Sequence, residues 1–220
     1  MTTPHLKLAI FDIDGTLRRV RDPWVHLHQH LGVLDQADGF VEQWERGQIT
    51  YEEWVRLDAE LWRGQSRQSI LAALKTSPYR DGARELVAWF TARSIPCVGI
   101  STGLSIFNEV TLAELGLTEV LSNELYFDKG VFNGQISINV REDNKSDLMN
   151  EVLVRYGVEA AQVVAFGDGS ADIPLLANAG LGIAVFPSKD KIRLAANLVI
   201  DDEPIDKAIP FVADYFIVEQ

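Results

Sequence analysis

The stretch Leu6-Lys-Leu-Ala-Ile-Phe-Asp-Ile-Asp-Gly-Thr-Leu17 decides how the rest of the chain is interpreted. Its apolar run, residues 8–11, is typical of a buried strand. Asp12 and Asp14 follow where that strand should end, at the edge where open parallel sheets bind ligands, and Gly15 permits a sharp turn. Two acids this close repel each other unless a cation or a shared proton intervenes. An Asp-Gly turn without a function is the alternative, and three later stretches decide between the two.

The composition is that of a soluble globular protein with an acidic surface. The chain has 220 residues, 47% hydrophobic and 24% charged, enough for one large domain or one domain with an insertion. Its formal net charge of -12 would repel nucleic acids and anionic membranes, so both are rejected as main partners. A small anionic substrate remains possible where a metal ion and a few basic groups act locally.

The single cysteine, Cys97, excludes a disulfide within the chain. It lies in the apolar run of residues 95–100, which favours an inert buried thiol over a nucleophile. The first residues have neither the basic nor the apolar region of a signal peptide. No apolar run approaches the roughly 20 residues that a membrane helix needs. A cytoplasmic location is therefore expected.

Residues 18–79 are expected to form an all-helical cap domain of about 60 residues, because they contain no good strand candidate. Asp22-Pro23 predicts a helix start, with Asp as the cap and Pro at the first helical position. Thr50 and Glu53 predict a capping box for a longer helix. Further helical segments are expected at residues 39–46 and 65–74, and the core domain is expected to comprise residues 1–17 and 80–220.

Asp58 interrupts an apolar stripe on the helix that starts at Tyr51. Aromatic and aliphatic residues occupy the positions i, i+3, i+4, i+10 and i+11 of this stripe, and Asp58 is its i+7 member. A carboxylate on such a face is costly to bury without a partner. Asp58 is therefore expected to form either a structural salt bridge or a substrate contact.

Three histidines at positions 26, 28 and 30 suggest a metal site at first sight. On a helix, only His26 and His30 share a face, and no acid or thiol completes a ligand set. We therefore interpret them as part of a solvated helix surface.

From residue 81 onward, helical and strand patterns alternate, which predicts a parallel α/β sheet covered on both faces. The expected fold class is a Rossmann-like parallel sheet with a small all-helical cap inserted after the first strand. Asp128-Lys-Gly130 predicts a hairpin over residues 124–140. Residues 201–220 are interpreted as a helix without an assigned function. The later strands are expected at residues 95–100, 119–121, 162–166, 181–185 and 198–200.

Two further strand ends place polar residues at the same edge as Asp12 and Asp14. Ser101 begins Ser-Thr-Gly directly before an expected helix, where a hydroxyl and free N–H groups suit a phosphate, although a simple N-cap is the alternative. Asp168 directly follows a buried strand. Asp172, four residues later, could merely cap the next helix.

Lys145 stands just before a helix expected from residue 146. A lone lysine there is usually a solvated surface charge. Four acids in one pocket would otherwise lack a cation, however, which favours a role for Lys145 at this edge. Carboxylates without soft ligands suit a hard, octahedral, water-rich Mg²⁺.

The ordered motifs resemble those of the haloacid dehalogenase superfamily. They are Asp12-Ile-Asp-Gly-Thr-Leu17, Ser101-Thr-Gly103, Lys145 and Gly167-Asp-Gly-Ser-Ala-Asp172. They span nearly the whole chain, and a small helical cap after the first motif resembles the phosphoserine-phosphatase-like branch. The resemblance implies a Mg²⁺-dependent phosphatase that hydrolyses a small phosphorylated metabolite.

The resemblance also implies roles for single residues. Asp12 would attack phosphorus and form an aspartyl-phosphate, and Asp14 would protonate the leaving alkoxide and later take a proton from water. A carboxylate attacks a phosphate dianion poorly until a metal and a lysine cancel the repulsion. By resemblance, Mg²⁺ would be held by Asp12, the Asp14 backbone carbonyl, Asp168 and Asp172, and the phosphoryl oxygens by Ser101, Thr102 and Lys145.

The chain departs from phosphoserine phosphatases at three places. Their first motif usually ends Ser-Thr, where this chain has Gly15-Thr16. The cap Glu that meets the substrate ammonium in those enzymes corresponds to Arg21, and the cap Arg that meets the carboxylate falls near Asp58. Both expected charges are reversed, so we do not expect phosphoserine as the substrate. Arg21 and Asp58 become candidate specificity residues.

Two other functions compete with the phosphatase. A phosphotransferase or phosphomutase would use the same aspartyl-phosphate with another acceptor than water. A receiver-like phospho-signalling module also uses an Asp, a Ser or Thr and a Lys, but such modules lack a helical insertion of this size. The sequence leaves the substrate, the acceptor and the oligomeric state open.

Overall fold

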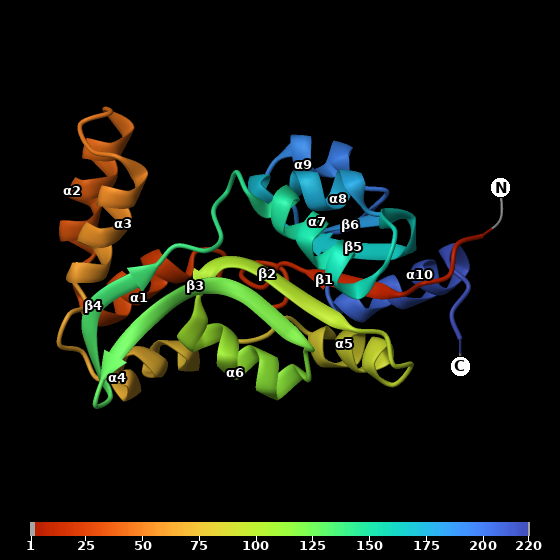
Figure 1. Ribbon diagram of the computed structural model, residues 1–220, viewed down its shortest axis with the longest axis horizontal. Coiled ribbons are helices and arrows are strands. Elements are labelled where there is room, and N and C mark those ends of the chain that lie inside the picture. Colours follow the sequence, from red (N-terminus) through yellow and green to blue (C-terminus); the bar gives the residue numbers. More distant parts are fainter. Residues whose placement is uncertain (1–2, 220) are drawn as a thin grey trace.

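The computed structural model describes residues 3–219 and contains one seven-stranded sheet (Figure 1). The strands are β1 Leu8–Phe11, β2 Cys97–Leu104, β3 Glu119–Asp128, β4 Val131–Ser137, β5 Val163–Gly167, β6 Leu181–Val185 and β7 Leu198–Ile200. Their order is β4-β3-β2-β1-β5-β6-β7, and only β3 and β4 pair antiparallel. The predicted Rossmann-like fold class is confirmed.

The first strand lies at the centre of the sheet because all four of its side chains are apolar and can be buried on both faces. Ala9 and Phe11 face one core cluster, whereas Leu8 and Ile10 face another. In the register, Phe11 pairs with Gly99 of β2 and with Phe166 of β5. The segments that follow these three strands therefore leave the sheet side by side.

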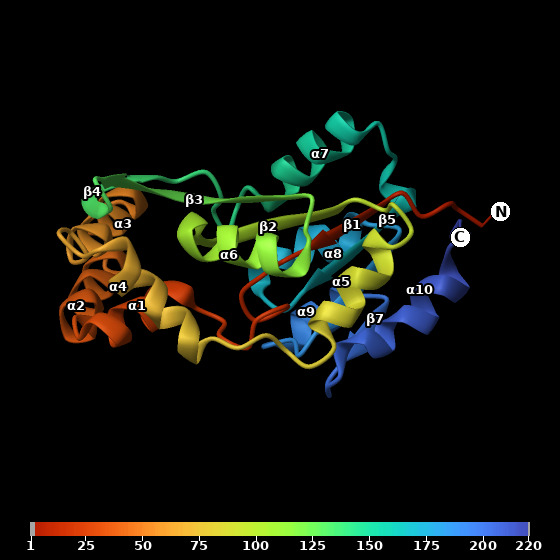
Figure 2. The same cartoon turned by 90° about the horizontal axis from the view of Figure 1, so that it is seen from below.

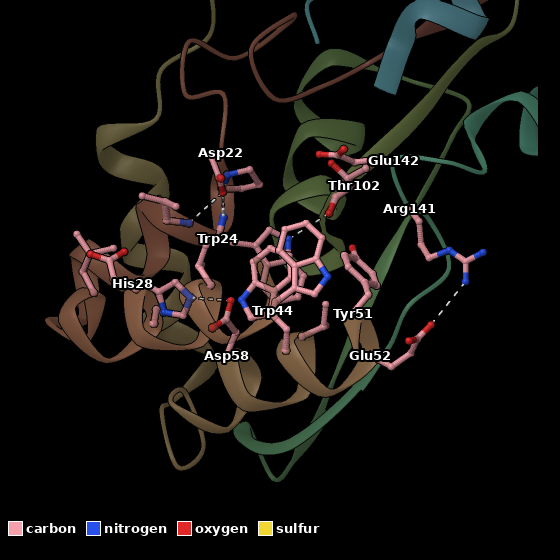
Figure 3. A pocket seen from close by; sticks show the side chains of 18 of the residues that line it. Asp22, Trp24, His28, Trp44, Tyr51, Glu52, Asp58, Thr102, Arg141 and Glu142 are labelled. Carbon is pink, nitrogen blue, oxygen red and sulfur yellow. Dashed lines mark hydrogen bonds and ion pairs between the residues drawn. The ribbon is translucent and has the colours of Figure 1, made fainter. Parts of the chain in front are cut away.

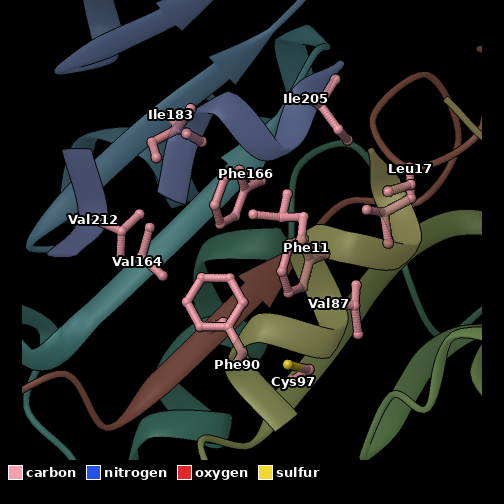
Figure 4. Packing of buried hydrophobic residues seen from close by; sticks show 14 of the residues in the cluster. Phe11, Leu17, Val87, Phe90, Cys97, Val164, Phe166, Ile183, Ile205 and Val212 are labelled. Carbon is pink, nitrogen blue, oxygen red and sulfur yellow. The ribbon is translucent and has the colours of Figure 1, made fainter. Parts of the chain in front are cut away.

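Helices cover both faces of the sheet (Figure 2). On one face Phe11 stacks on Phe166 with ring centroids 4.8 Å apart, and Phe90 meets Phe11 edge-on at 5.9 Å (Figure 4). Cys97 is buried in this cluster, and burial raises the pKa of its thiol to about 12, as expected of an inert cysteine. This face carries α5 Ala83–Thr91, α6 Ser105–Leu115 and α10 Ile209–Tyr215, and the other carries α7 Lys145–Tyr156, α8 Ile173–Asn178 and α9 Asp190–Ala195.

Within residues 18–79 the regular elements are helical, as predicted. Asp22 caps the first of them by accepting hydrogen bonds from the N–H groups of Trp24 and Val25, both at 3.0 Å. Thr50 and Glu53 form the predicted capping box. The division of the chain into a core domain and a cap domain stays a prediction. The helices are α1 Pro23–Leu31, α2 Leu34–Glu45, α3 Tyr51–Glu60 and α4 Arg67–Ala72, followed by a 3-10 turn at Ala73–Thr76.

Backbone hydrogen bonds hold the cap, residues 18–79, at two places. Its two linkers run antiparallel, with the Arg19 N–H bonded to the Pro78 carbonyl at 3.0 Å and the Arg80 N–H bonded to the Leu17 carbonyl at 2.8 Å. The tip of the β3–β4 hairpin also contacts the cap, because the N–H groups of Gly64 and Arg67 bond to carbonyls of that hairpin. Figure 1 shows the hairpin beside the cap helices.

Several element boundaries differ from the sequence prediction. Helix α2 begins five residues before the expected 39–46 segment. Ala37 is buried in its first turns and α2 packs on α3, which outweighs the low helix propensity of Gly39. The expected strand 119–121 and the first hairpin strand form one strand, β3.

The C-terminal prediction of a helix over residues 201–220 was too long. Pro204 and Pro210 lack the N–H groups that a continuous helix requires, so only a 3-10 turn at Ile205–Ala208 and the short α10 form. Residue 220 lies outside the described part. Across residues 3–219, no helix combines the length and the apolar character needed to span a bilayer.

Candidate active site

Lys145 is buried between two carboxylates at the C-terminal edge of the sheet. Its Nζ donates to Asp12 Oδ1 and to Asp172 Oδ1, each at 2.6 Å, and the residue is only 2% exposed. Burial alone lowers the pKa of Lys145, but the charges of Asp12 and Asp172 outweigh it, so the pKa lies above its usual value. The alternative of a solvated surface lysine is therefore wrong.

Asp172 organises the loop after β5 rather than capping the helix α8. Its Oδ2 accepts hydrogen bonds from the N–H groups of Asp168 at 3.1 Å and Gly169 at 2.8 Å, and its side chain makes no cap bond to α8. Asp172 is 1% exposed. One carboxylate thus fixes the position of Asp168 and orients Lys145.

Ser101 faces Asp14 and is not a helix cap. Its hydroxyl donates to Asp14 Oδ2 at 3.0 Å and accepts from the Gly103 N–H at 2.9 Å. Because β2 continues to Leu104, α6 begins only at Ser105, so the expected helix N-terminus does not lie directly at the Ser-Thr-Gly motif. A Cβ at position 103 would lie 2.3 Å from Asp14 Oδ2, so glycine is required there.

Three of the four acids form a cluster that fits a divalent metal ion. Asp12, Asp168 and Asp172 each offer an oxygen within 4.8 Å of the others, and all three are buried. Gly15, at φ +92, leaves the room that Asp168 occupies, since a Cβ there would lie 2.4 Å from its carboxylate oxygens. Buried hard oxygen donors of this kind suit a hard divalent cation.

Thr16 is a site residue that the sequence reasoning missed. Its hydroxyl lies 3.1 Å from Asp12 Oδ2 and 3.3 Å from Asp168 Oδ1, and the residue is fully buried. It can orient both carboxylates. The signal was present in the first motif, where a hydroxyl residue follows directly after the Gly turn.

Burial and mutual repulsion raise the pKa values of these carboxyl groups. Burial, then the charge of Asp12, raises the pKa of Asp14 from 3.8 to about 7. The pKa values of Asp12 and Asp168 are raised chiefly by burial and then by the neighbouring acids. The site thus carries excess negative charge that a bound cation would relieve.

The excess negative charge of the site predicts an unusual pH dependence of stability in the metal-free protein. A carboxyl group whose pKa is higher in the folded state keeps its proton there longer than in the unfolded chain. The free energy of unfolding is therefore expected to fall as the pH rises from about 4 to about 7, the span between the unfolded and folded pKa values of Asp14. A divalent cation should add more stability at the upper end of this window.

Urea unfolding across this pH range, with EDTA or with Mg²⁺, would measure the effect. Asp14→Asn serves as the reference, because the difference from the original protein isolates the Asp14 carboxyl group from the other titrating groups. A wild-type curve parallel to that of Asp14→Asn, or an equal effect of Mg²⁺ at both ends of the window, would contradict the prediction.

Arg21 lies at the boundary between this cluster and the cap. Its Nη1 is 3.3 Å from Asp168 Oδ2, and its Nη2 donates to the Phe186 carbonyl. The Thr102 carbonyl accepts hydrogen bonds from Trp24 Nε1 at 3.1 Å and from Asn123 Nδ2 at 2.8 Å. Trp24 and Asn123, which the sequence reasoning did not single out, thus tie the second motif to α1 and β3.

A cavity of about 590 Å³ extends from Arg21 and Thr102 into the cap (Figure 3). Its walls come from α1, α2 and α3 and from the loop that precedes Lys145. Asp58 lies in its wall with a side chain that is 4% exposed. Burial raises the pKa of Asp58 despite its neighbour His28.

The prediction of a solvated surface was wrong for His28. His28 is 1% exposed, its Nε2 lies 3.4 Å from Asp58 Oδ2, and its Nδ1 accepts a hydrogen bond from Trp62 Nε1 at 3.1 Å. The partner of Asp58 is thus a histidine from another helix. His26 is half-buried and contacts the Ala73 carbonyl at 2.9 Å.

The chain is similar to several known proteins. The profile of the haloacid dehalogenase-like hydrolase family matches residues 9–177. A phosphoserine phosphatase of Archaeoglobus fulgidus is 29% identical over 200 residues, covering 90% of this chain and 57% of that protein. One from Albidiferax ferrireducens is 29% identical over 213 residues, covering 92% and 88%.

Solved structures show the same fold. A phospho-aspartyl intermediate analogue of phosphoserine phosphatase superposes with a TM-score of 0.77 at 22% identity, covering 94% of this chain and 99% of that one. An unliganded probable phosphoserine phosphatase from Vibrio cholerae gives a TM-score of 0.83 at 23% identity, covering 96% and 66%. The chain therefore belongs to the haloacid dehalogenase-like hydrolase family, in its phosphoserine-phosphatase-like branch.

Proposed function

We propose that this protein hydrolyses a small phosphomonoester through an aspartyl-phosphate on Asp12, with Mg²⁺ as cofactor. The observation that carries the proposal is the buried arrangement of Lys145 on one oxygen of Asp12 and Thr16 on the other, at 2.6 and 3.1 Å. These contacts hold the carboxylate in one orientation at the end of β1. A fixed carboxylate beside a lysine ammonium is suited to attack phosphorus.

In the first step an Asp12 oxygen forms a bond to phosphorus, and the bond between phosphorus and the leaving-group oxygen breaks. Lys145 offsets the negative charge of the attacking carboxylate and of the phosphoryl oxygens. Ser101 and the backbone N–H of Thr102 lie at the adjacent strand end and contact the phosphoryl group from the other side. Held by Asp12, the Asp14 backbone carbonyl, Asp168 and Asp172, Mg²⁺ would supply a further positive charge at the phosphoryl oxygens.

Asp14 supplies and later accepts the proton. With a pKa of about 7, it is partly protonated near neutral pH and can protonate the departing alkoxide. The resulting carboxylate then takes a proton from the water that attacks the aspartyl-phosphate, which releases inorganic phosphate and restores Asp12. Without substrate the Ser101 hydroxyl donates to the Asp14 carboxyl group, and it can turn to a phosphoryl oxygen when substrate binds.

The test is hydrolysis of p-nitrophenyl phosphate at neutral pH with Mg²⁺ or with EDTA. We expect metal-dependent release of nitrophenol and an equal amount of inorganic phosphate. A deficit of inorganic phosphate that appears only when alcohols are added would instead identify a phosphotransferase. Absence of turnover in well-folded protein with Mg²⁺ would contradict the proposed phosphatase.

A further inference from the structure

We propose that the cap cavity binds the positively charged amine of the leaving group, so that the substrate is an amino-alcohol phosphate without a carboxylate. The inference rests on the proposed function and specifies its substrate class. It starts from Asp58, whose side chain is 4% exposed and lines the cavity. Among the described residues its Oδ1 has no hydrogen-bond partner.

The neighbouring histidine does not neutralise Asp58. The indole N–H of Trp62 can only donate, so His28 Nδ1, which lies 3.1 Å from it, must be an acceptor. His28 Nε2, the ring atom that faces Asp58, approaches Asp58 Oδ2 to 3.4 Å but makes no hydrogen bond to it. Among the described residues the buried Asp58 carboxyl group thus has no hydrogen-bonded cation, and a bound ammonium would supply one.

Aromatic side chains form the wall beside Asp58. Trp44 and Trp54 stack with centroids 4.7 Å apart, and Tyr51 meets Trp54 edge-on at 5.7 Å. Trp24 adds a further indole to the lining (Figure 3). Aromatic faces attract ammonium groups, including substituted ones, whose charge is spread over apolar carbon atoms.

The remaining charges of the cavity also favour a cation. Its two arginines are already paired: Arg21 with Asp168, and Arg141 with Glu52 and Asp143. A substrate carboxylate would thus find no unpaired cation in this lining. The acids of the lining are Asp22, Asp38, Glu52, Asp58, Glu142 and Asp143.

Two matched pairs of substrates test the inference. Phosphocholine and 3,3-dimethylbutyl phosphate have the same shape and differ in the charge of the leaving group. Phosphoethanolamine and phosphoserine differ only in the carboxylate. We expect kcat/KM to be about tenfold to 100-fold higher for phosphocholine than for its neutral isostere, and higher for phosphoethanolamine than for phosphoserine.

Asp58→Asn should bring the phosphocholine to dimethylbutyl phosphate ratio close to one, because it keeps the shape of the side chain and removes its charge. Glu45→Gln, which removes a charge from an exposed position of α2 outside the cavity, should leave the ratio unchanged. Trp44→Leu replaces a side chain that is 38% exposed and should lower the ratio without endangering the fold.

The two proposals can fail separately. Hydrolysis of p-nitrophenyl phosphate would support the phosphatase. If the two members of each substrate pair then react equally, or if phosphoserine reacts best, the amine site is overturned and the phosphatase proposal remains. If no ester is hydrolysed, the phosphatase fails. In that case the binding affinities of the same compounds are measured by the fluorescence of the cavity tryptophans. Equal affinities within each pair would overturn the amine site, and tighter binding of phosphocholine would support it.

Discussion

Asp12→Asn should abolish phosphomonoester turnover while the protein stays folded. The amide has nearly the shape of the carboxylate but cannot attack phosphorus, so kcat should fall on the order of 10⁴-fold or more. The fold should survive because the charged form of Asp12 is disfavoured by burial in the first place. The amide oxygen can keep the bond from Lys145 Nζ, and the amide NH₂ can donate to the Thr16 hydroxyl on the other side.

The measurement combines initial rates with acid quenching and intact-protein mass spectrometry. The original protein should show a phosphorylated species during turnover, and Asp12→Asn should show none. Ser188→Ala removes the hydroxyl of an exposed residue that lies near the backbone carbonyl of Asp168 rather than its carboxylate, and it is the control for general disturbance of the site. A phosphorylated species in the Asp12→Asn protein would assign the nucleophile to another residue.

Lys145→Met should lower both activity and stability, and the loss of stability should depend on pH. Without the ammonium, Asp12 and Asp172 remain buried with no cation between them. Breaking a buried ion pair in this way costs about 3–5 kcal/mol. Protonation of the two carboxyl groups relieves that cost, so the destabilisation should be largest above neutral pH and should shrink as the pH falls.

Urea unfolding of the metal-free variant at several pH values would measure this change. Lys191→Met, at an exposed position on α9, removes a lysine of the same chemistry from the surface and should have little effect at any pH. A pH-independent loss of stability in Lys145→Met would mean that lost packing, not the uncompensated carboxylates, is responsible.

The residues at the C-terminal edge of the sheet could be predicted from the sequence because they belong to short local motifs. Asp12 and Asp168 both follow directly after apolar strands, and parallel strands place their carboxyl ends together. The role of Asp172 could not be derived in this way. Its carboxylate turns back to the N–H groups of its own loop, a local conformation that has no periodic signal.

The cap was harder to predict because its polar contacts join separate helices. His28 lies on α1, Asp58 on α3, and Trp62 follows α3, so their meeting depends on how the helices pack. The apolar stripe correctly indicated that Asp58 would be buried. The hydrophobic periodicity of α1 alone could not show that His28 points inward, since a histidine occurs both in buried and in exposed positions.

The contact between the cap and the β3–β4 hairpin has a mechanical consequence. Besides its two linkers, the cap is joined to the sheet through bonds from Gly64 and Arg67 to the hairpin tip. The cap is therefore attached to the core both at its linkers and at the hairpin tip, and not at its linkers alone. A change in the position of the cap would therefore also move the tip of this hairpin, whose pairing is irregular between Leu125 and Phe127.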